Sequence, residues 1–244
     1  MRAGSLAKAS LTMILDFALP ARCSGCGTIV GEVHSFCPDC WTQIEFLGES
    51  GCTTCGMPLE ATEAEHCGAC IARPPRIART RSAVAYGDLS RRIAISLKYG
   101  RKVALARTMA RYMAPLLAAN EDAILVPVPL HRTRLWMRGF NQSALVATEL
   151  GKATGLTSRP ALLKRVRRTP ALKGMTLSQR KKVVSGAFRV APSADLEGRT
   201  VVLIDDVLTT GSTANACAKA LKRAGAGRVE LISWARVIKP MQLS

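Results

Sequence analysis

The fold is decided by one stretch of the chain, Val201-Val-Leu-Ile-Asp-Asp-Val-Leu-Thr-Thr-Gly-Ser-Thr213. The apolar, β-branched run from Thr200 to Ile204 predicts a buried strand. Two adjacent carboxylates follow, then a hydroxyl-rich turn with one glycine, then a predicted helix from Ser212 to Ala224. This order places backbone N–H groups at a helix start beside serine and threonine hydroxyls, an arrangement suited to a phosphate monoester.

The two carboxylates restrict the phosphate-containing ligands that would fit this site. Asp205 and Asp206 would lie near whatever carries the phosphate, and carboxylates there can accept hydrogen bonds from the vicinal hydroxyls of a ribose. A sugar phosphate therefore fits. The simpler alternative is an ordinary strand, turn and helix, in which Ser212 or Thr210 caps the helix and the aspartates complement its dipole. That alternative explains the hydroxyls but not two acids at a buried strand end.

The flanking sequence predicts an α/β domain. Strands are expected at Ala83–Tyr86, Ile124–Val128, Thr200–Ile204 and Arg228–Val237. Helices are expected at Leu89–Tyr99, Val103–Leu117, Asn141–Thr154 and Ser212–Ala224. Alternating strands and helices indicate a mainly parallel sheet, whose ligand sites lie beyond the carboxyl ends of its strands.

Eight of the nine cysteines form four C-x-x-C pairs in the N-terminal part of the chain. The pairs are Cys23/Cys26, Cys37/Cys40, Cys52/Cys55 and Cys67/Cys70. Two such knuckles make a tetrahedral thiolate site for Zn²⁺, so four make two closed, structural sites. Disulfides are the rival interpretation, but they need an oxidising compartment. Neighbouring pairs would form two successive zinc ribbons and alternate pairs a cross-brace; we favour the ribbons. His34 and His66 are not required as ligands.

The chain divides at Arg73-Pro-Pro-Arg76, because consecutive prolines impose an extended connector. We therefore expect an N-terminal helix over residues 1–22, a double zinc ribbon over 23–72 and the α/β domain over 76–244. The apolar stretch Leu11–Ala21 contains Thr12, Asp16 and Pro20, too interrupted for a membrane span. No signal-peptide cleavage pattern follows it, so a cytoplasmic location is expected.

Charge is distributed unevenly along the 244 residues. The chain carries 35 Lys/Arg and 17 Asp/Glu, a net charge of +18, yet residues 1–75 hold only four basic residues against eight acidic ones. Any polyanion-binding surface therefore belongs to the C-terminal part. Residues Arg159 to Arg189 include ten basic and no acidic residues. This segment fits a solvated mobile face, a lid over an anionic ligand, or a track for nucleic-acid phosphates.

The central motif resembles the phosphoribosyl-pyrophosphate (PRPP) motif of type I phosphoribosyltransferases. Val126-Pro-Val-Pro-Leu-His-Arg-Thr-Arg-Leu-Trp-Met-Arg-Gly-Phe-Asn-Gln142 is similar to the signature of the ComF (competence protein F) family, which joins cysteine knuckles to that fold. Lys98, the Leu19-Pro-Ala-Arg-Cys23 stretch and the segment Ser178–Phe188 are also similar to the family. Thr169-Pro-Ala-Leu-Lys173 stands where a Thr-x-x-Gln is expected, which is a departure from the pattern.

The resemblance implies a concrete site. Asp205 and Asp206 would hold the ribose 2′ and 3′ hydroxyls, and the loop Pro129–Asn141 would bind pyrophosphate together with Mg²⁺. The residues that would cradle the 5′-phosphate are Thr209, Thr210, Gly211, Ser212 and Thr213. Arg132, Arg138 and the backbone at Gly139 are the candidates for pyrophosphate, since planar arginine donors match phosphate oxygens. The residues taken as catalytic are Asp205, Asp206 and Arg138.

Two functions follow from these expectations. The first is an enzyme that binds PRPP or a nucleotide and transfers phosphoribose with release of pyrophosphate, linked to DNA uptake and competence. The second is a non-catalytic accessory factor that holds single-stranded DNA on its basic face, with the DNA-uptake machinery as partner. Trp136 and Phe140 are expected to anchor their loop to the core rather than to stack a base. The acceptor of the phosphoribosyl group is not identified by the sequence.

Overall fold

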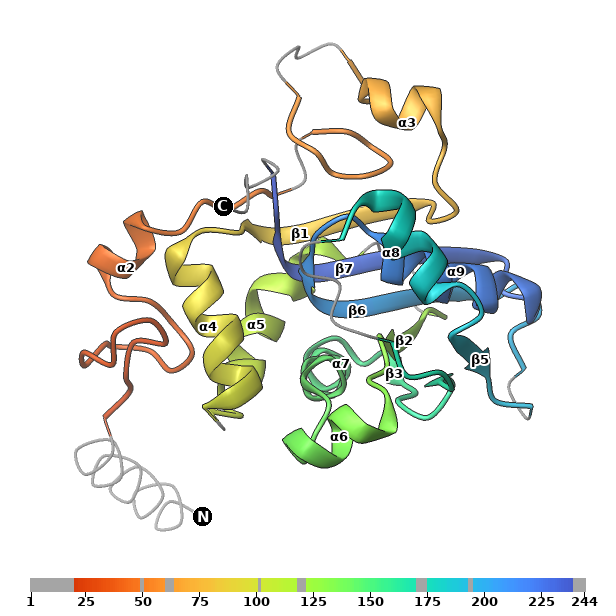
Figure 1. Cartoon of the computed structure of the whole chain (residues 1–244). Coiled ribbons are helices and arrows are strands. Elements are labelled where there is room, and N and C mark those ends of the chain that lie inside the picture. Colours follow the sequence, from red (N-terminus) through yellow and green to blue (C-terminus); the bar gives the residue numbers. More distant parts are fainter. Residues whose placement is uncertain are drawn as a thin grey trace, which may run out of the picture.

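A five-stranded parallel sheet organises the C-terminal part of the chain (Figure 1). The computed structural model describes residues 20–48, 51–59, 64–100, 102–117, 122–169, 175–192 and 195–238. In these residues the strand order is β1-β7-β6-β2-β3, and every pairing is parallel. The strands are β1 (Arg79–Ala85), β2 (Ile124–Pro127), β3 (Thr157–Ser158), β6 (Thr200–Leu208) and β7 (Arg228–Arg236). The predicted fold class, a mainly parallel α/β sheet, is confirmed.

Helices pack on both faces of the sheet because successive residues of the central strands point to opposite faces. Val202 and Ile204 of β6 join one core cluster, whereas Val201 and Leu203 join the other. The first face is covered by α4 (Asp88–Tyr99), α5 (Leu105–Met113) and α7 (Gln142–Thr154). The second face is covered by α8 (Leu177–Val184) and α9 (Ser212–Arg223), with the short antiparallel pair β4 (Leu163–Arg165) and β5 (Phe188–Val190) beside them.

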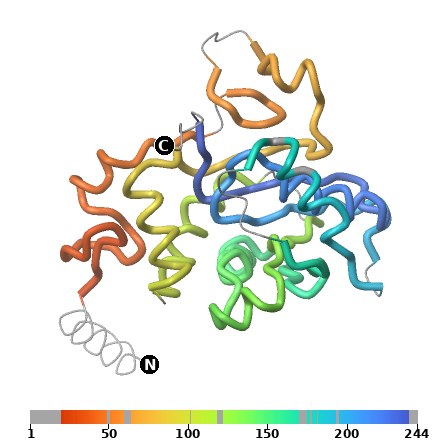
Figure 2. The backbone as a smooth tube through the Cα atoms, viewed as in Figure 1, coloured from red at the N-terminus to blue at the C-terminus, as the bar shows by residue number. Residues whose placement is uncertain are grey.

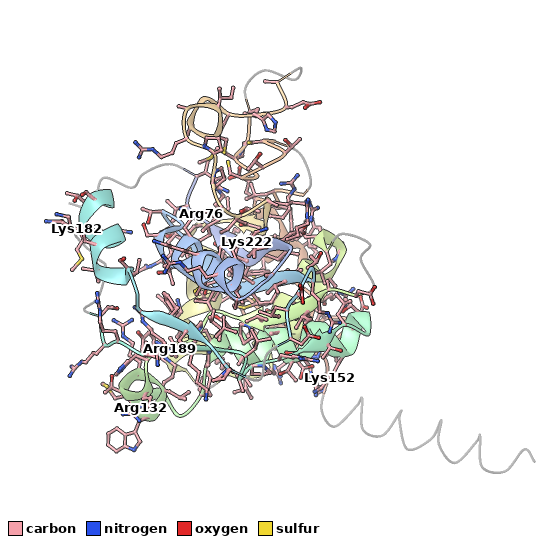
Figure 3. The ribbon with its side chains drawn as sticks, turned by 90° about the vertical axis from the view of Figure 1, so that its right-hand side faces the viewer. Arg76, Arg132, Lys152, Lys182, Arg189 and Lys222 are labelled. Carbon is pink, nitrogen blue, oxygen red and sulfur yellow. The ribbon has the colours of Figure 1, made fainter. Side chains whose placement is uncertain are left out.

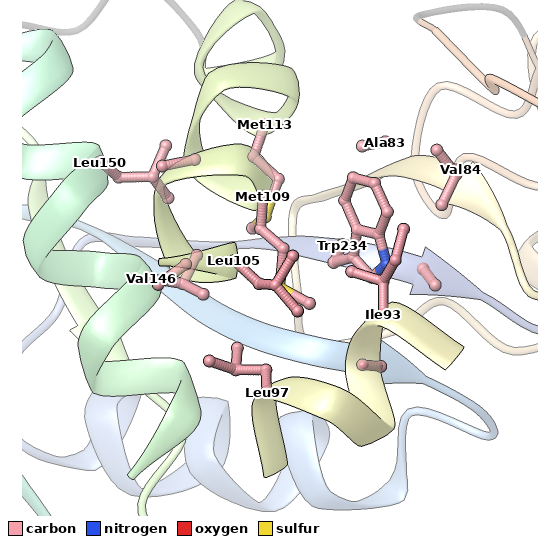
Figure 4. Packing of buried hydrophobic residues seen from close by; sticks show 14 of the residues in the cluster. Ala83, Val84, Ile93, Leu97, Leu105, Met109, Met113, Val146, Leu150 and Trp234 are labelled. Carbon is pink, nitrogen blue, oxygen red and sulfur yellow. The ribbon is translucent and has the colours of Figure 1, made fainter. Parts of the chain in front are cut away.

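The first core cluster is the larger one and reaches the N-terminal part of the chain. Figure 4 shows Trp234 of β7 among the side chains of α4 and α5, with Leu150 of α7 on the other side of the cluster. The Trp234 side chain is fully buried, and its indole Nε1 donates a hydrogen bond to the carbonyl of Ser90 at 3.2 Å. Burial of aromatic and aliphatic side chains of this size supplies most of the stability of such a core.

Strand lengths differ from the predicted ones for a physical reason. β1 begins at Arg79 rather than at Ala83, because the polar residues before Ala83 are buried in the strand and their side chains form hydrogen bonds. The Ser82 hydroxyl lies 2.7 Å from that of Ser233, and Arg81 donates to the carbonyl of Thr53 at 3.0 Å. A hydrophobic pattern does not detect such a strand. The other predicted strands and helices are present within a few residues of the expected ends.

The predicted α5 helix ends earlier than expected. It stops at Met113 and continues as a short 3-10 helix, η1 (Ala114–Leu116), which contains Pro115. The proline has no N–H for the α-helical hydrogen-bond ladder, which accounts for the tighter final turn.

The cysteine-rich segments contact the sheet domain at two separate places (Figure 2). The first segment contains α2 (Pro38–Thr42), and Leu47 N–H donates to the carbonyl of Ala83 in β1 at 3.0 Å. The second contains α3 (Gly68–Ala72) and is joined to β1 by the hydrogen bond from Thr80 N–H to the carbonyl of Thr54 at 2.7 Å. The predicted N-terminal helix falls on residues 1–22, almost all of them outside the described residues. Within the described chain, no helix combines the length and the apolar character that crossing a membrane requires.

Candidate functional site

The strand that carries the two acids is longer than predicted. β6 runs to Leu208 instead of ending at Ile204, so Asp205 and Asp206 lie inside the strand rather than beyond it. The extension exists because β7 is nine residues long and pairs with β6 as far as Leu208. The acids therefore have a rigid backbone. Asp206 is buried and Asp205 is partly buried.

The turn between β6 and α9 contains a glycine in the left-handed region at the start of the helix. Gly211 has a φ of 69°, in the left-handed region that favours glycine, and it is the N-cap residue of α9. Because glycine has no side chain, it cannot cap the first amides of the helix. The hydroxyls of Thr210 and Ser212 lie 2.9 Å apart instead. The alternative in which Ser212 or Thr210 occupies the N-cap position of this helix is therefore wrong.

Both carboxylates are held by the first residues of α7. Ser143 Oγ donates to Asp205 Oδ1 at 3.2 Å, and Gln142 Nε2 donates to Asp206 Oδ1, also at 3.2 Å. Lys98, at the end of α4, forms an ion pair with Asp206 Oδ2. Sequence reasoning missed Gln142 and Ser143 as part of this group. Their one signal was the Asn-Gln-Ser run at a predicted helix start, which follows the strand neighbouring β6.

Asp205 and Asp206 lie in different electrostatic environments. Burial, and next the charge of Asp206, raises the pKa of Asp205 to about 7. Burial alone would lower the pKa of Lys98, but the Asp206 carboxylate outweighs burial and raises it. Asp206 therefore forms an ion pair with Lys98, whereas Asp205 can change its protonation near neutral pH.

The segment predicted as a loop after β2 contains a helix. α6 (Arg132–Arg138) occupies the middle of Pro129–Asn141. Its N-cap residue is His131, whose Nδ1 accepts a hydrogen bond from Thr133 N–H at 3.3 Å, and Gly139 ends it with a φ of 83°. The sequence interpretation missed the helix because prolines precede it and a glycine follows within one short span. These same residues are its start and stop signals.

The two arginines proposed for pyrophosphate lie at opposite ends of α6. Arg138 forms a hydrogen bond with Gln142 Oε1, and Gln142 in turn contacts Asp206, so Arg138 belongs to the acid group. Arg132 lines a separate cavity of about 620 Å³ between α6 and β4, together with His131 and Arg165. Arg132 and Arg138 are six residues apart in the helix, which corresponds to a rise of roughly 9 Å along its axis.

The described residues of the basic segment Arg159–Arg189 include regular secondary structure. It contains the β4–β5 pair and α8, which begins with a capping box between Thr176 and Gln179. Arg165 is buried, stacks over the Phe188 ring with its guanidinium carbon 5.4 Å from the centroid, and bonds to the Thr169 hydroxyl. The departure from the family pattern after Thr169 lies mostly outside the described residues.

The eight knuckle cysteines form two groups of four. The first contains Cys23, Cys26, Cys37 and Cys40, and the second Cys52, Cys55, Cys67 and Cys70; within each group the sulfur atoms lie within 4.8 Å of one another. Neighbouring pairs are thus combined, as the ribbon arrangement predicts, and the cross-brace is wrong. Four thiol donors at this separation fit a closed tetrahedral Zn²⁺ site. His34 and His66 belong to neither group.

Backbone N–H groups stabilise the thiolate form of two of these cysteines, Cys23 and Cys52. Cys37 N–H donates to Cys23 Sγ at 3.2 Å. Burial alone would raise the pKa of Cys23, but this and other backbone donors outweigh it and lower the pKa to about 6. The same balance lowers the pKa of Cys52 to about 5. Thiolates stabilised in this way are the form that binds zinc.

Comparison with known families matches both parts of the chain. A double zinc ribbon domain model matches residues 14–71, and a phosphoribosyl transferase domain model matches residues 153–239. Competence protein F of Haemophilus influenzae is 30% identical over 227 residues, covering 88% of this chain and 96% of that protein. The DNA utilization protein YhgH of Salmonella typhimurium is 30% identical over 223 residues, covering 88% of this chain and 90% of the relative.

A more distant relative and a solved structure extend the comparison. Competence protein ComFC of Streptococcus pneumoniae is 27% identical over 228 residues, covering 88% of this chain and 100% of that protein. The adenine phosphoribosyltransferase of Thermoanaerobacter pseudethanolicus is 18% identical with a TM-score of 0.37, covering 56% of this chain and 82% of that one.

Three findings lead to the same assignment: the two cysteine groups, the parallel sheet, and the 30% sequence identity with Competence protein F over most of both chains. The chain belongs to the ComF (competence protein F) family, with an N-terminal double zinc ribbon and a type I phosphoribosyltransferase fold.

Proposed function

We propose that this protein binds PRPP with Mg²⁺ at the carboxyl end of β6 and transfers the phosphoribosyl group to an acceptor with release of pyrophosphate. One observation carries the proposal: two adjacent carboxylates on β6, held by α4 and α7, precede a glycine turn whose helix has no side-chain cap at its N-cap residue. The relatives named for competence and DNA utilization support a role linked to DNA uptake. We place this role in the cytoplasm.

The 5′-phosphate would occupy the turn from Thr209 to Thr213. The first N–H groups of a helix attract an anion through the helix dipole, and three threonines and one serine add hydroxyl donors. Gly211 allows the backbone to approach the phosphate closely because it has no Cβ.

The ribose would lie against Asp205 and Asp206. Each carboxylate has one oxygen engaged by an α7 side chain, which fixes its orientation before a ligand arrives. Lys98 neutralises one of the two negative charges. Bound Mg²⁺ would neutralise the clustered phosphate charge while it keeps several water ligands.

The leaving group would be stabilised by arginine. In the transfer, the acceptor's lone pair forms a bond to the anomeric carbon, and the bond from that carbon to the pyrophosphate oxygen breaks with its electron pair. Arg138 is tied to the acid group through Gln142, so it is the arginine best placed to stabilise the negative charge that develops on pyrophosphate. The Gly139 backbone, next to Arg138, would contact the same ligand, whereas Arg132 lines the separate cavity at the other end of α6.

Titration calorimetry with PRPP and Mg²⁺ tests this proposal. The Asp205→Asn/Asp206→Asn double variant should lose measurable PRPP affinity, whereas Asp88→Asn should keep it, because Asp88 is an exposed acid at the start of α4. Retention of full affinity in the double variant would refute the assignment of the ribose site.

A second candidate function is the binding of single-stranded DNA, alone or beside the enzyme activity. Figure 3 shows Arg76, Lys182, Arg189 and Lys222 along one side of the molecule. Three exposed cations, Arg189 of β5 and Lys219 and Arg223 of α9, line a cavity of about 490 Å³ on the second face of the sheet domain. A row of cations of this kind suits a phosphate backbone.

Salt dependence distinguishes this candidate from PRPP binding. The logarithm of DNA affinity should fall linearly with log salt, and neutral substitutions at Arg189, Lys219 and Arg223 should reduce the slope. The Asp205→Asn/Asp206→Asn variant should bind the oligonucleotide as the unchanged protein does. An oligonucleotide affinity that ignores both salt and these three cations would refute the candidate.

A further inference from the structure

Helix α6 exposes large apolar side chains that the proposed enzyme activity does not use. The Trp136 side chain is 86% exposed and Met137 is 80% exposed. The expectation that Trp136 anchors its segment to the core is therefore wrong, whereas Phe140 does pack against the first core cluster. An indole is the largest apolar side chain, and leaving it in water forgoes the stabilisation that its burial would bring. Such exposure on an ordered helix indicates a binding role.

The exposure does not come from a frayed segment. α6 is capped by His131 at its start and by the left-handed Gly139 at its end. Arg138 bonds to Gln142 at the start of α7, and Arg134 reaches the carbonyl of Thr169 at 3.5 Å. A short helix held at both ends presents Trp136 in a defined place.

An exposed arginine lies on the same side of the helix as Trp136. At about 100° per residue, Leu135, Trp136 and Met137 spread over roughly 200° of the circumference of α6, and Arg132 lies within this arc, four residues from Trp136. Arg134 and Arg138 lie on the remaining side of the helix. A helix that lies on a lipid surface keeps its charged residues off the apolar face. A cation beside an exposed indole fits a ligand that offers a flat ring next to a negative charge.

A second exposed aromatic is joined to α6. Tyr99, at the end of α4, is 71% exposed, and the guanidinium carbon of Arg138 lies 5.0 Å from its ring centroid. Between Asp122 and Glu149 the chain has no acidic residue, so nothing in this stretch repels an anion. Tyr99 therefore adds a second exposed ring beside α6, on the side of Arg138.

We propose that α6 is a stacking platform for single-stranded nucleic acid, with a base on the Trp136 indole and a flanking phosphate on Arg132. Every base has a flat π-face, so such a platform binds strands with little sequence preference. The inference rests on the second candidate function above. It adds to that function a residue that contacts a base, which lies on α6 and is separate from the cavity lined by Arg189, Lys219 and Arg223.

Fluorescence anisotropy of a labelled oligothymidylate of about 12 nucleotides tests the platform. Trp136→Ala should weaken binding about 5- to 150-fold, the range for loss of one stacked base, and Trp136→Phe should restore most of the affinity. Met137→Ala is the matched control, since it removes a similarly exposed apolar side chain without a π-face and should change affinity less than about twofold. All three changes keep the charge, so the salt slope should stay the same.

Three outcomes would overturn the inference. If the unchanged protein does not bind the oligonucleotide, the second candidate function falls with it, while PRPP titration still decides the first. If the unchanged protein binds and Trp136→Ala binds equally well, DNA is held elsewhere and only the platform falls. If phosphatidylserine vesicles shift the tryptophan emission of the unchanged protein but not that of Trp136→Ala, and the oligonucleotide shifts neither, α6 is a lipid-contacting helix instead.

Discussion

Replacing Asp205 by asparagine should make the folded chain more stable at neutral pH while it removes PRPP binding. The asparagine side chain would keep an oxygen that accepts from Ser143 Oγ and from Asp206 N–H, the two donors that Asp205 Oδ1 has now. What disappears is a negative charge that is partly buried beside Asp206. The acid is therefore kept at a cost in stability, which is typical of a residue that serves binding.

The size of the effect follows from the pKa. Burial, and next the Asp206 charge, raises the pKa of Asp205 from 3.8 to about 7 in the folded chain. A raised folded-state pKa means that the carboxyl contributes its full stability below pH 3.8 and loses it as pH rises through about 7. At about 1.36 kcal/mol per pKa unit the upper limit is about 4 kcal/mol. Because Asp205 is partly exposed, we expect about 2 kcal/mol at about pH 8, or a Tm increase of roughly 4–8 °C.

Thermal unfolding, followed by circular dichroism in the presence of zinc, measures this difference. The Tm advantage of Asp205→Asn should be small near pH 3.8, grow with pH, and become constant above about pH 7. The matched variant is Asp206→Asn, which leaves the largely buried Lys98 without its paired carboxylate and should destabilise the fold by about 3 kcal/mol. The electrostatic difference between the two acids would be refuted if both variants changed the Tm in the same direction, or if the Tm gain of Asp205→Asn did not depend on pH.

The remaining predictions concern the ligand, the turn and the zinc sites. PRPP affinity should increase between about pH 6 and about pH 8, because the ionised Asp205 carboxylate accepts hydrogen bonds from the ribose hydroxyls. Calorimetry at both pH values measures this increase, and equal affinities would argue against a role of Asp205 in binding the ribose. Gly211→Ala should cost roughly 1–2 kcal/mol, since its φ of 69° is left-handed, and should weaken PRPP binding; an unchanged Tm would contradict this account of the turn. Cys40→Ser should release zinc from the first cysteine group, because it removes one of the four thiol ligands. The release should also change tryptophan emission, because the centroid of the Trp41 ring, next to Cys40, lies 4.6 Å from that of Phe46. Zinc retained at full occupancy would count against the ligand assignment.

Local patterns in the sequence were enough for the zinc knuckles and for the motif that carries the acids. Four C-x-x-C pairs predict two thiolate sites, because the spacing itself brings two sulfur atoms into one turn. The β6 run, its turn and α9 are contiguous, so their order could be predicted without knowing the rest of the fold. The parallel sheet followed from the alternation of strands and helices.

Only the tertiary structure decided which side chains surround the acids. Lys98 and Gln142 come from elements far from Asp206 in the sequence, and Gln142 is 64 positions away. Parallel pairing of β2 with β6 brings the start of α7 beside the end of β6, and no local periodicity encodes that pairing. The same holds for Trp136. Whether a tryptophan is buried depends on what packs over its helix, and that is a property of the assembled chain rather than of the residues next to it.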